Sequence, residues 1–183
     1  MTQPKPIKET YSVKQAWVTA ALVLATSALF GLAVLPHIGE QHSAHTGSAA
    51  PEFSLPLAGD IEGSRWALSA YRGRVVVLDF WALWCKPCRE QMPITERLAR
   101  GRSKDVVVVG VNEGDPMADV EAFVAKQRPG YDVVSDADGE VAERYQVRGL
   151  PTLVVIDRSG RVSGFESGVV PYARLERLVD EAK

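Results

Sequence analysis

The sequence contains little cysteine, little net charge and little histidine, and each shortage excludes a class of protein. Only two of its 183 residues are cysteine, too few for the several disulfides that stabilise many small secreted domains. The 21 basic and 23 acidic residues give a net charge of −2, which argues against a nucleic-acid-binding protein. All three histidines lie within residues 37–45, so residues 51–183 offer no histidine ligand for a metal. The hydrophobic share of 46% is nevertheless that of a folded chain.

Residues 17–35, WVTAALVLATSALFGLAVL, form an apolar run without a charged residue. A helix of this length, at about 1.5 Å per residue, would span the hydrocarbon core of a bilayer. Residues 1–16 carry three lysines against one glutamate, which favours a cytoplasmic N-terminus. We therefore expect residues 17–35 to be a single-pass signal anchor in the inner (cytoplasmic) membrane. The alternatives are a cleaved signal peptide, whose apolar region is normally shorter, and a buried core helix, which the missing polar face disfavours.

Residues 36–50 are mostly small and polar, and we interpret them as a flexible linker on the periplasmic or extracytoplasmic side. His37, His42 and His45 lie in this linker without a cysteine or carboxylate cluster beside them, so we predict no metal site there. Residues 51–183 are long enough for one domain with its own core.

Within residues 51–183, apolar runs rich in valine alternate with segments that carry helical signals. The nearly continuous runs RVVVLDF (74–80) and DVVVVGV (105–111) are typical of strands that are buried on both faces. This alternation, followed by a hairpin, predicts an α/β domain with a central mixed β-sheet flanked by helices. We expect further strands over 53–57 and 65–68 at the sheet edge, over 131–134, and over 152–157 and 161–168 as the hairpin, with helices over 85–100, 116–128, 139–145 and 171–182.

Cys85-Lys86-Pro87-Cys88 follows the first buried strand and opens the first helix of this domain. The unpaired N–H groups and positive dipole of a helix N-terminus stabilise a thiolate, which we expect at Cys85 as the more exposed cysteine, with Lys86 adding positive charge. Cys88 lies about one helical turn further on and can attack a mixed disulfide formed at Cys85. The spacing therefore predicts a redox-active dithiol. Arg89 behind it is expected to be a solvated helix charge.

Other interpretations of this motif have less support. A zinc site needs about four ligands, and residues 51–183 contain neither a second Cys-x-x-Cys nor a histidine. A purely structural disulfide across so few residues would constrain the unfolded chain little. A peroxidase would be expected to use a single peroxidatic cysteine rather than this pair.

The stretch LDFWALWCKPCR, residues 78–89, resembles the thioredoxin superfamily, and above all its membrane-anchored extracytoplasmic branch, the TlpA/ResA/DsbE-like reductases. PEFSL (51–55), Met92-Pro93 and VRGLPT (147–152) are similar to further segments of that branch. The resemblance covers nearly all of residues 51–183. It implies a thioredoxin-like fold and thiol–disulfide exchange without a cofactor.

The resemblance also implies a surface that binds the client protein. Proteins of this family hold a cis-proline beside the active site, so we expect a cis bond between Leu150 and Pro151, with the Leu150 backbone pairing with the client. Trp84 and Pro87 are expected to contact the client as well, and Trp84 to cover the sulfur of the first cysteine. Trp81 is expected to pack inside the domain.

Acidic residues near the motif are candidates for proton transfer. Asp79 lies in a buried strand, where burial should raise its pKa, so it could exchange a proton with Cys88; a structural, hydrogen-bonded aspartate is the alternative. The branch also has an acidic residue in the loop after the second buried strand, where Glu113 and Asp115 are the candidates, although Asp115 could instead be a helix N-cap. Gln91 stands where the branch usually has glutamate.

We therefore predict a membrane-anchored, extracytoplasmic thiol–disulfide oxidoreductase that reduces client proteins. A proline before the second cysteine, as in reducing thioredoxins, favours this direction by analogy. The resemblance implies a membrane electron donor of the DsbD or CcdA type and an apocytochrome c as client, with a copper-site assembly protein of a terminal oxidase as a second candidate client. The alternatives are a disulfide oxidase or isomerase with the same cysteines, and a copper-binding assembly chaperone for a terminal oxidase. Chaperones of this fold use a three-residue spacer and a distant histidine, which residues 51–183 do not offer.

Overall fold

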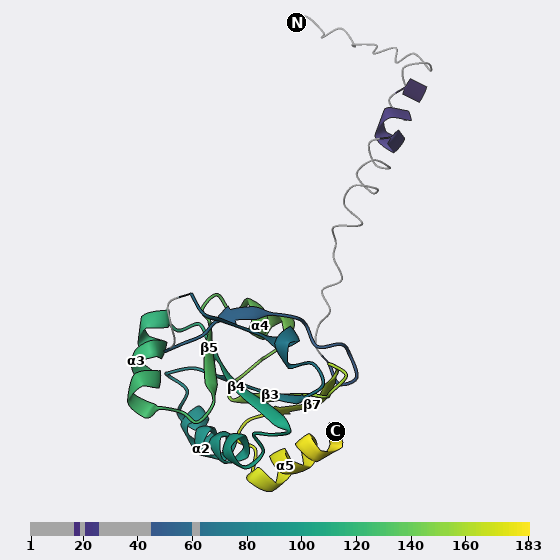
Figure 1. The fold of residues 1–183 in the computed structure, drawn as a ribbon. Helices are drawn as coiled ribbons and strands as arrows, with labels where there is room; N and C mark the ends of the chain where they lie inside the picture. Colours follow the sequence, from purple (N-terminus) through teal and green to yellow (C-terminus); the bar gives the residue numbers. More distant parts are fainter. Residues whose placement is uncertain (1–16, 19–20, 26–44, 60–62) are drawn as a thin grey trace, which may run out of the picture. The chain divides into compact units, whose positions relative to one another are not determined.

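The computed structural model describes residues 17–18, 21–25, 45–59 and 63–183. The chain divides into two compact units, Met1–Gln41 and His42–Lys183. In the first unit, residues 17–18 and 21–25 are helical (Figure 1). Among the described residues, no helix is both long enough and apolar enough to cross a membrane. Most of the predicted anchor (17–35), all of residues 1–16 and most of the predicted linker (36–50) lie outside the described residues.

The second unit is organised around a five-stranded mixed sheet in the order β5-β4-β3-β6-β7 (Figure 1). The first three of its strands along the chain are parallel to one another, whereas β6 is antiparallel to both of its neighbours. Every residue of the central strand β3 is buried, as expected for a strand covered on both faces. The strands are β3 (Val75–Trp81), β4 (Val106–Glu113), β5 (Asp132–Asp136), β6 (Thr152–Ile156) and β7 (Val162–Ser167).

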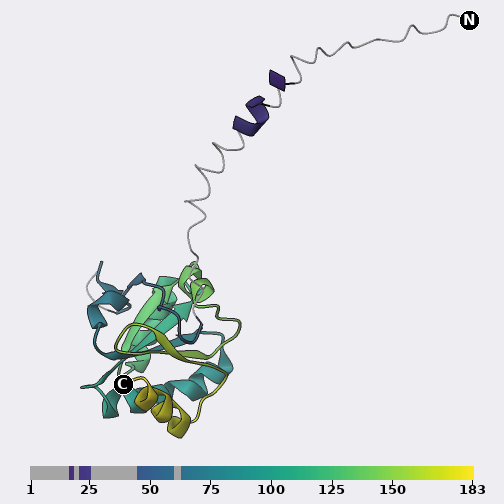
Figure 2. The same cartoon turned by 90° about the vertical axis from the view of Figure 1, so that its right-hand side faces the viewer.

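Helices cover both faces of this sheet (Figures 1 and 2). On one face, Leu98 of α2 and Leu175 of α5 form an apolar cluster with Val77 of β3. On the other face, Tyr145, at the end of α4, packs with Phe80 of β3. The arrangement confirms the predicted α/β architecture. The helices are α2 (Lys86–Gly101), α3 (Met117–Gln127), α4 (Glu140–Arg144) and α5 (Tyr172–Glu181).

The two early strands are not part of the main sheet, so the prediction of two edge strands holds only at one point. Leu57, directly after the first of them, forms an isolated antiparallel bridge with Val134 of the edge strand β5. β1 (Ser54–Pro56) and β2 (Arg65–Ala67) pair with each other as a separate antiparallel sheet, and η2 (Leu68–Tyr71) is a short 3-10 helix after them. The cause is aromatic packing: Phe53 stacks on Trp66 at 5.5 Å, and both side chains are buried in the core cluster on the α4 side. The strands therefore cover a face of the sheet instead of extending it.

The compact unit begins a few residues before the expected start at Pro51. Gly47 N–H donates to the Val162 carbonyl at 2.7 Å, and Val162 N–H donates to the Ser48 carbonyl at 2.9 Å. Ala50 is buried, and its N–H donates to Gly160. Residues 47–50 therefore pair with the hairpin, although they were expected to belong to the linker.

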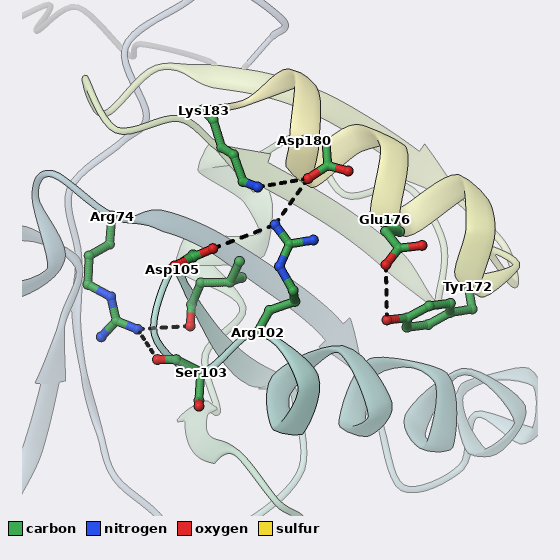
Figure 3. Close-up of polar contacts among 9 residues, drawn as sticks. Arg74, Arg102, Ser103, Asp105, Tyr172, Glu176, Asp180 and Lys183 are labelled. Atoms are coloured by element: carbon green, nitrogen blue, oxygen red, sulfur yellow. Dashed lines mark hydrogen bonds and ion pairs between the residues drawn. The ribbon is translucent and has the colours of Figure 1, made fainter.

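Polar contacts hold the C-terminal end of α2 against α5 (Figure 3). Arg102, directly after α2, forms ion pairs with Asp180 of α5 at 3.0 Å and with Asp105 at 3.8 Å. Lys183 contacts the same Asp180 carboxylate at 2.9 Å. Arg74 donates to the carbonyl groups of the α2–β4 loop at 2.7 Å and of the first β4 residue at 2.9 Å. These contacts fix the end of α2 that lies away from the cysteines.

Candidate active site

The two cysteines lie where β3 ends and α2 begins, and they form a disulfide. Cys85 is the N-cap residue of α2, and its sulfur accepts a hydrogen bond from the Cys88 N–H at 3.2 Å. Pro87 occupies the first helical turn, where a residue without an N–H costs no hydrogen bond. The motif therefore places one sulfur among the unpaired N–H groups of a helix N-terminus, the environment that stabilises a thiolate after reduction.

Both cysteines are buried in this disulfide form, at 2% exposure for Cys85 and 1% for Cys88. The exposed fractions of the two cysteines hardly differ, so the expected greater exposure of Cys85 is not evident in the oxidised state. Trp84 is 75% exposed, so only a small part of its surface is packed against other residues. The cysteines are covered by an apolar cluster that includes Trp81, which was expected to pack inside the domain. Residues distant in the sequence, such as Val120 of α3, also belong to this cluster.

The proline segment reaches the same end of the sheet as the cysteines. The Leu150–Pro151 bond is cis, which confirms the prediction. Thr152, the first residue of β6, pairs with Phe80 near the end of β3, so Pro151 lies beside the segment that leads to the motif. Leu150 is half-buried and packs against the apolar cluster that contains both cysteines. The structure thus brings the predicted client-binding residues together around the disulfide.

Val169 is a surface residue that the sequence reasoning missed. Gly168 N–H donates to the Pro151 carbonyl at 2.8 Å, which places this loop beside the proline segment. Val169 is 42% exposed, and in the described part of the second unit it shares the status of a large exposed apolar side chain only with Trp84. Its exposure beside the proline segment makes Val169 a candidate for contact with a client. The only sign in the sequence was the pair Val169-Val170 in a short turn-like segment between Gly168 and Pro171.

Asp79 lies on the face of β3 that α2 covers, because it alternates along the strand with Val75 and Val77, which pack there. It is 1% exposed, and neither carboxyl oxygen has a hydrogen-bond partner of normal geometry among the described residues. Burial raises the pKa of Asp79 to about 7, with the Thr95 hydroxyl of α2 opposing the shift. A carboxyl group with this pKa can both take up and release a proton near neutral pH.

Gln91 is fully buried and links α2 to the loop before α5. Its amide donates to the Thr95 hydroxyl at 3.1 Å, and its carbonyl oxygen accepts the Val170 N–H at 2.8 Å. The neighbouring Glu90 is exposed. Gln91 thus holds α2 to the loop before α5 through hydrogen bonds of its uncharged amide. The adjacent carboxylate of Glu90 points to solvent and does not take over this role.

Glu113 and Asp115 lie in different environments. Glu113 ends β4 opposite Asp136, and burial, with the charge of Asp136 as the second cause, raises the pKa of Glu113. Asp115 is not the N-cap of α3, so that prediction is wrong: Pro116 holds the cap position without a side-chain bond. The carboxylate of Asp115 instead accepts a hydrogen bond from the backbone N–H of Leu83, next to the motif, at 2.7 Å.

Arg89 also departs from its predicted role. The side chain is exposed, but its guanidinium donates to the Leu83 carbonyl at 3.1 Å, so it is more than a solvated charge. In the described residues, no group of three or more His, Cys, Asp or Glu side chains is positioned to hold a metal ion. The site brings together two sulfurs and the apolar cluster around them, and a buried carboxyl group lies on the strand that leads to them.

Comparison with known proteins identifies the family of the chain. The model of the AhpC/TSA family matches residues 46–164. The thiol-disulfide oxidoreductase ResA of Geobacillus kaustophilus is 33% identical over 165 residues, covering 89% of this chain and 93% of that protein. ResA of Bacillus subtilis is 34% identical over 144 residues, covering 78% of this chain and 79% of that protein.

A solved structure agrees with these relatives. The crystal structure described as a thiol:disulfide interchange protein DsbE from Chlorobium tepidum superposes with a TM-score of 0.68 at 35% identity, over 76% of this chain and 99% of that one. The chain therefore belongs to the AhpC/TSA family of thioredoxin-like proteins and is a thiol–disulfide oxidoreductase.

Proposed function

We propose that this oxidoreductase reduces disulfides of client proteins outside the cytoplasm while anchored in the inner membrane. The observation that carries the reducing direction is the arrangement of Cys85-Lys86-Pro87-Cys88 at the start of α2, on the sheet face where Asp79 is buried. A proline before the second cysteine is the spacer found in reducing thioredoxins. The buried acid supplies a proton acceptor for the second sulfur.

The proposed reaction runs in two exchanges. The Cys85 thiolate attacks a client disulfide, forms a mixed disulfide and releases one client thiolate. Cys88 loses its proton to Asp79, and its thiolate attacks the Cys85 sulfur, which releases the second client thiolate. The client gains two electrons, and the motif closes as the Cys85–Cys88 disulfide. A second pair of exchanges with an electron donor restores the dithiol.

The partners follow from the surface and from the resemblance to TlpA/ResA/DsbE-like reductases. Leu150 packs against the cluster that contains both cysteines, Trp84 precedes Cys85 in the chain, and Val169 follows the glycine that bonds to Pro151. We propose that these three side chains together bind an unfolded or extended client segment. We propose an apocytochrome c as the client and a DsbD- or CcdA-type membrane protein as the donor. The anchor is supported by the charge-free run at 17–35 and by the exposed apolar side chains of Trp17 and Leu24.

The decisive experiment is to trap the mixed disulfide in cells. Cys88→Ser removes the thiol that releases the client, so Cys85 should accumulate covalent complexes, which mass spectrometry identifies after non-reducing electrophoresis. Cys85→Ser is the matched control and should capture nothing. Complexes with proteins that carry paired cysteines support the proposal, whereas the absence of any complex contradicts it.

The reduction potential separates the reductant from the oxidase. A value near about −270 mV, as in thioredoxin, supports reduction, and a value near about −120 mV would refute it. Titration of the reduced protein with Cu(I) tests the copper chaperone. Tight stoichiometric copper binding without disulfide reductase activity would replace the proposal by that alternative.

A further inference from the structure

Residues 82–84 connect β3 to α2 and carry the chain into Cys85, yet they belong to neither element. The turn itself contributes one backbone bond, from the Cys85 N–H to the Ala82 carbonyl at 3.1 Å. The position of Cys85 therefore depends on whatever else holds this connecting segment. The hydrogen bonds of the Leu83 backbone N–H and carbonyl groups show what holds this segment.

Two charged side chains hold Leu83 from opposite sides. Its N–H donates to Asp115 Oδ2 at 2.7 Å, and its carbonyl oxygen accepts a bond from Arg89 Nη2 at 3.1 Å. Asp115 comes from the loop between β4 and α3, whereas Arg89 lies in the first turns of α2. The segment next to the reactive cysteine is thus fixed both to the sheet side and to the helix that carries the second cysteine.

Asp115 is itself fixed to the sheet. Its Oδ2 also accepts a bond from Asn112 Nδ2 at 2.8 Å, and Asn112 is a fully buried residue of β4. Asn112 pairs with Trp81, the last residue of β3, in the sheet register. A single carboxylate oxygen therefore joins the end of β4, next to its neighbour β3, to the connecting segment.

We propose that Asp115 is a positioning residue, which sets the place of Cys85 by accepting the Leu83 N–H, and that it does not act as an acid or base. The Oδ2 atom of Asp115 already accepts hydrogen bonds from two N–H groups, those of the Leu83 backbone and the Asn112 side chain. An amide oxygen at the same place accepts the same two bonds. The inference depends on the exchange chemistry of the motif and not on its direction or on the identity of the client.

Two variants of Asp115 separate holding from proton transfer. Asp115→Asn keeps an acceptor oxygen and loses the charge, whereas Asp115→Ala loses both. The full-length protein in detergent is assayed for disulfide exchange with insulin from pH 5 to 9, and protection of the Leu83 amide from hydrogen exchange is measured by NMR. Asp119→Asn and Asp119→Ala, at an exposed aspartate in the first turn of α3, are the matched controls.

The expected result is a rate of exchange about tenfold lower for Asp115→Ala, with loss of Leu83 protection, because a misplaced reacting group is costly. Asp115→Asn should keep the rate within about threefold, the pH profile and the protection. Equal losses in both variants, or a changed pH profile in Asp115→Asn, would show that the charge matters and overturn the proposal. An unaffected Asp115→Ala would overturn it too. If Asp115→Ala does not fold, the pH profile and Leu83 protection of Asp115→Asn decide alone.

Discussion

Replacing Asp79 with asparagine tests the buried carboxyl group through the stability of the protein. Asp79 is 1% exposed, and burial raises its pKa to about 7, from an ordinary value of 3.8. In the unfolded chain the same group ionises at the ordinary value. Asparagine has a similar shape and cannot ionise, so Asp79→Asn removes this difference between the two states.

The sign and size of the effect follow from linkage. A group with a raised pKa in the folded state stabilises folding fully below its unfolded pKa, and this stability is lost as the pH rises through the folded pKa. The pH window therefore runs from about 4 to about 7. Each pKa unit corresponds to about 1.4 kcal/mol, so the free energy of unfolding should fall by roughly 4 kcal/mol across the window because of Asp79 alone.

The assay is urea denaturation of the oxidised compact unit, residues 42–183, at pH values from 4 to 8. The asparagine amide can add a constant cost, because its N–H groups are buried without acceptors. The measured quantity is therefore the difference in unfolding free energy, variant minus wild type, as a function of pH. This difference should increase by about 3–4 kcal/mol from pH 4 to pH 8.

Parallel stability curves for the two proteins would refute the reasoning, since they would mean that Asp79 titrates at the same pH in both states. Asp119→Asn is the control, because this aspartate is exposed and its replacement should leave the pH dependence unchanged. A rise that starts near pH 4 and continues above pH 8 would place the pKa of Asp79 in the folded state higher than burial predicts here.

Two further predictions concern the supports of the site and the side chains proposed to bind the client. Gln91→Leu leaves the buried Val170 N–H without its acceptor and should lower the unfolding free energy by about 2 kcal/mol in denaturant titrations, whereas Glu90→Gln, on the exposed side of the helix, should change it by less than about 0.5 kcal/mol. Trp84→Ala removes a 75% exposed indole, so the free energy of unfolding should change by less than about 0.5 kcal/mol. Disulfide exchange with a protein client should slow several-fold more than exchange with a small disulfide. Equal slowing for both substrates would contradict a docking role of Trp84.

The central part of the fold could be predicted because its strands are buried on both faces. Such strands read as continuous apolar runs, and the expected strand at 74–80 corresponds to β3 (Val75–Trp81) within one residue. The helices could be located from proline near their first turns and from the chain order. These signals are local, so a single sequence carries them.

The pairing of the short early strands could not be predicted in the same way. Their pattern indicates extended backbone but does not specify a partner, and the outcome depends on Trp66 stacking on Phe53 over the face of the sheet. Likewise, the position of Asp115 before a helix suggests an N-cap. The sequence cannot show that its carboxylate instead binds the backbone N–H of Leu83, which is distant along the chain. The burial of Cys85 has the same origin, since Val120 and Leu150, which help to cover the cysteines, arrive from distant segments.

The antiparallel contact between β3 and β6 separates what must stay constant in this protein from what is free to vary. The strand before the disulfide and the strand after Pro151 are direct neighbours, with Phe80 opposite Thr152. The excursion through α3 and β5 is attached on the far side of β3, through β4. Its outer surface can therefore change without altering the spacing of sulfur and proline, provided that Asp115 and Val120, which hold and cover the cysteine segment, are kept. Evolution or protein engineering can thus retarget the enzyme on that outer surface while its reaction centre is inherited unchanged.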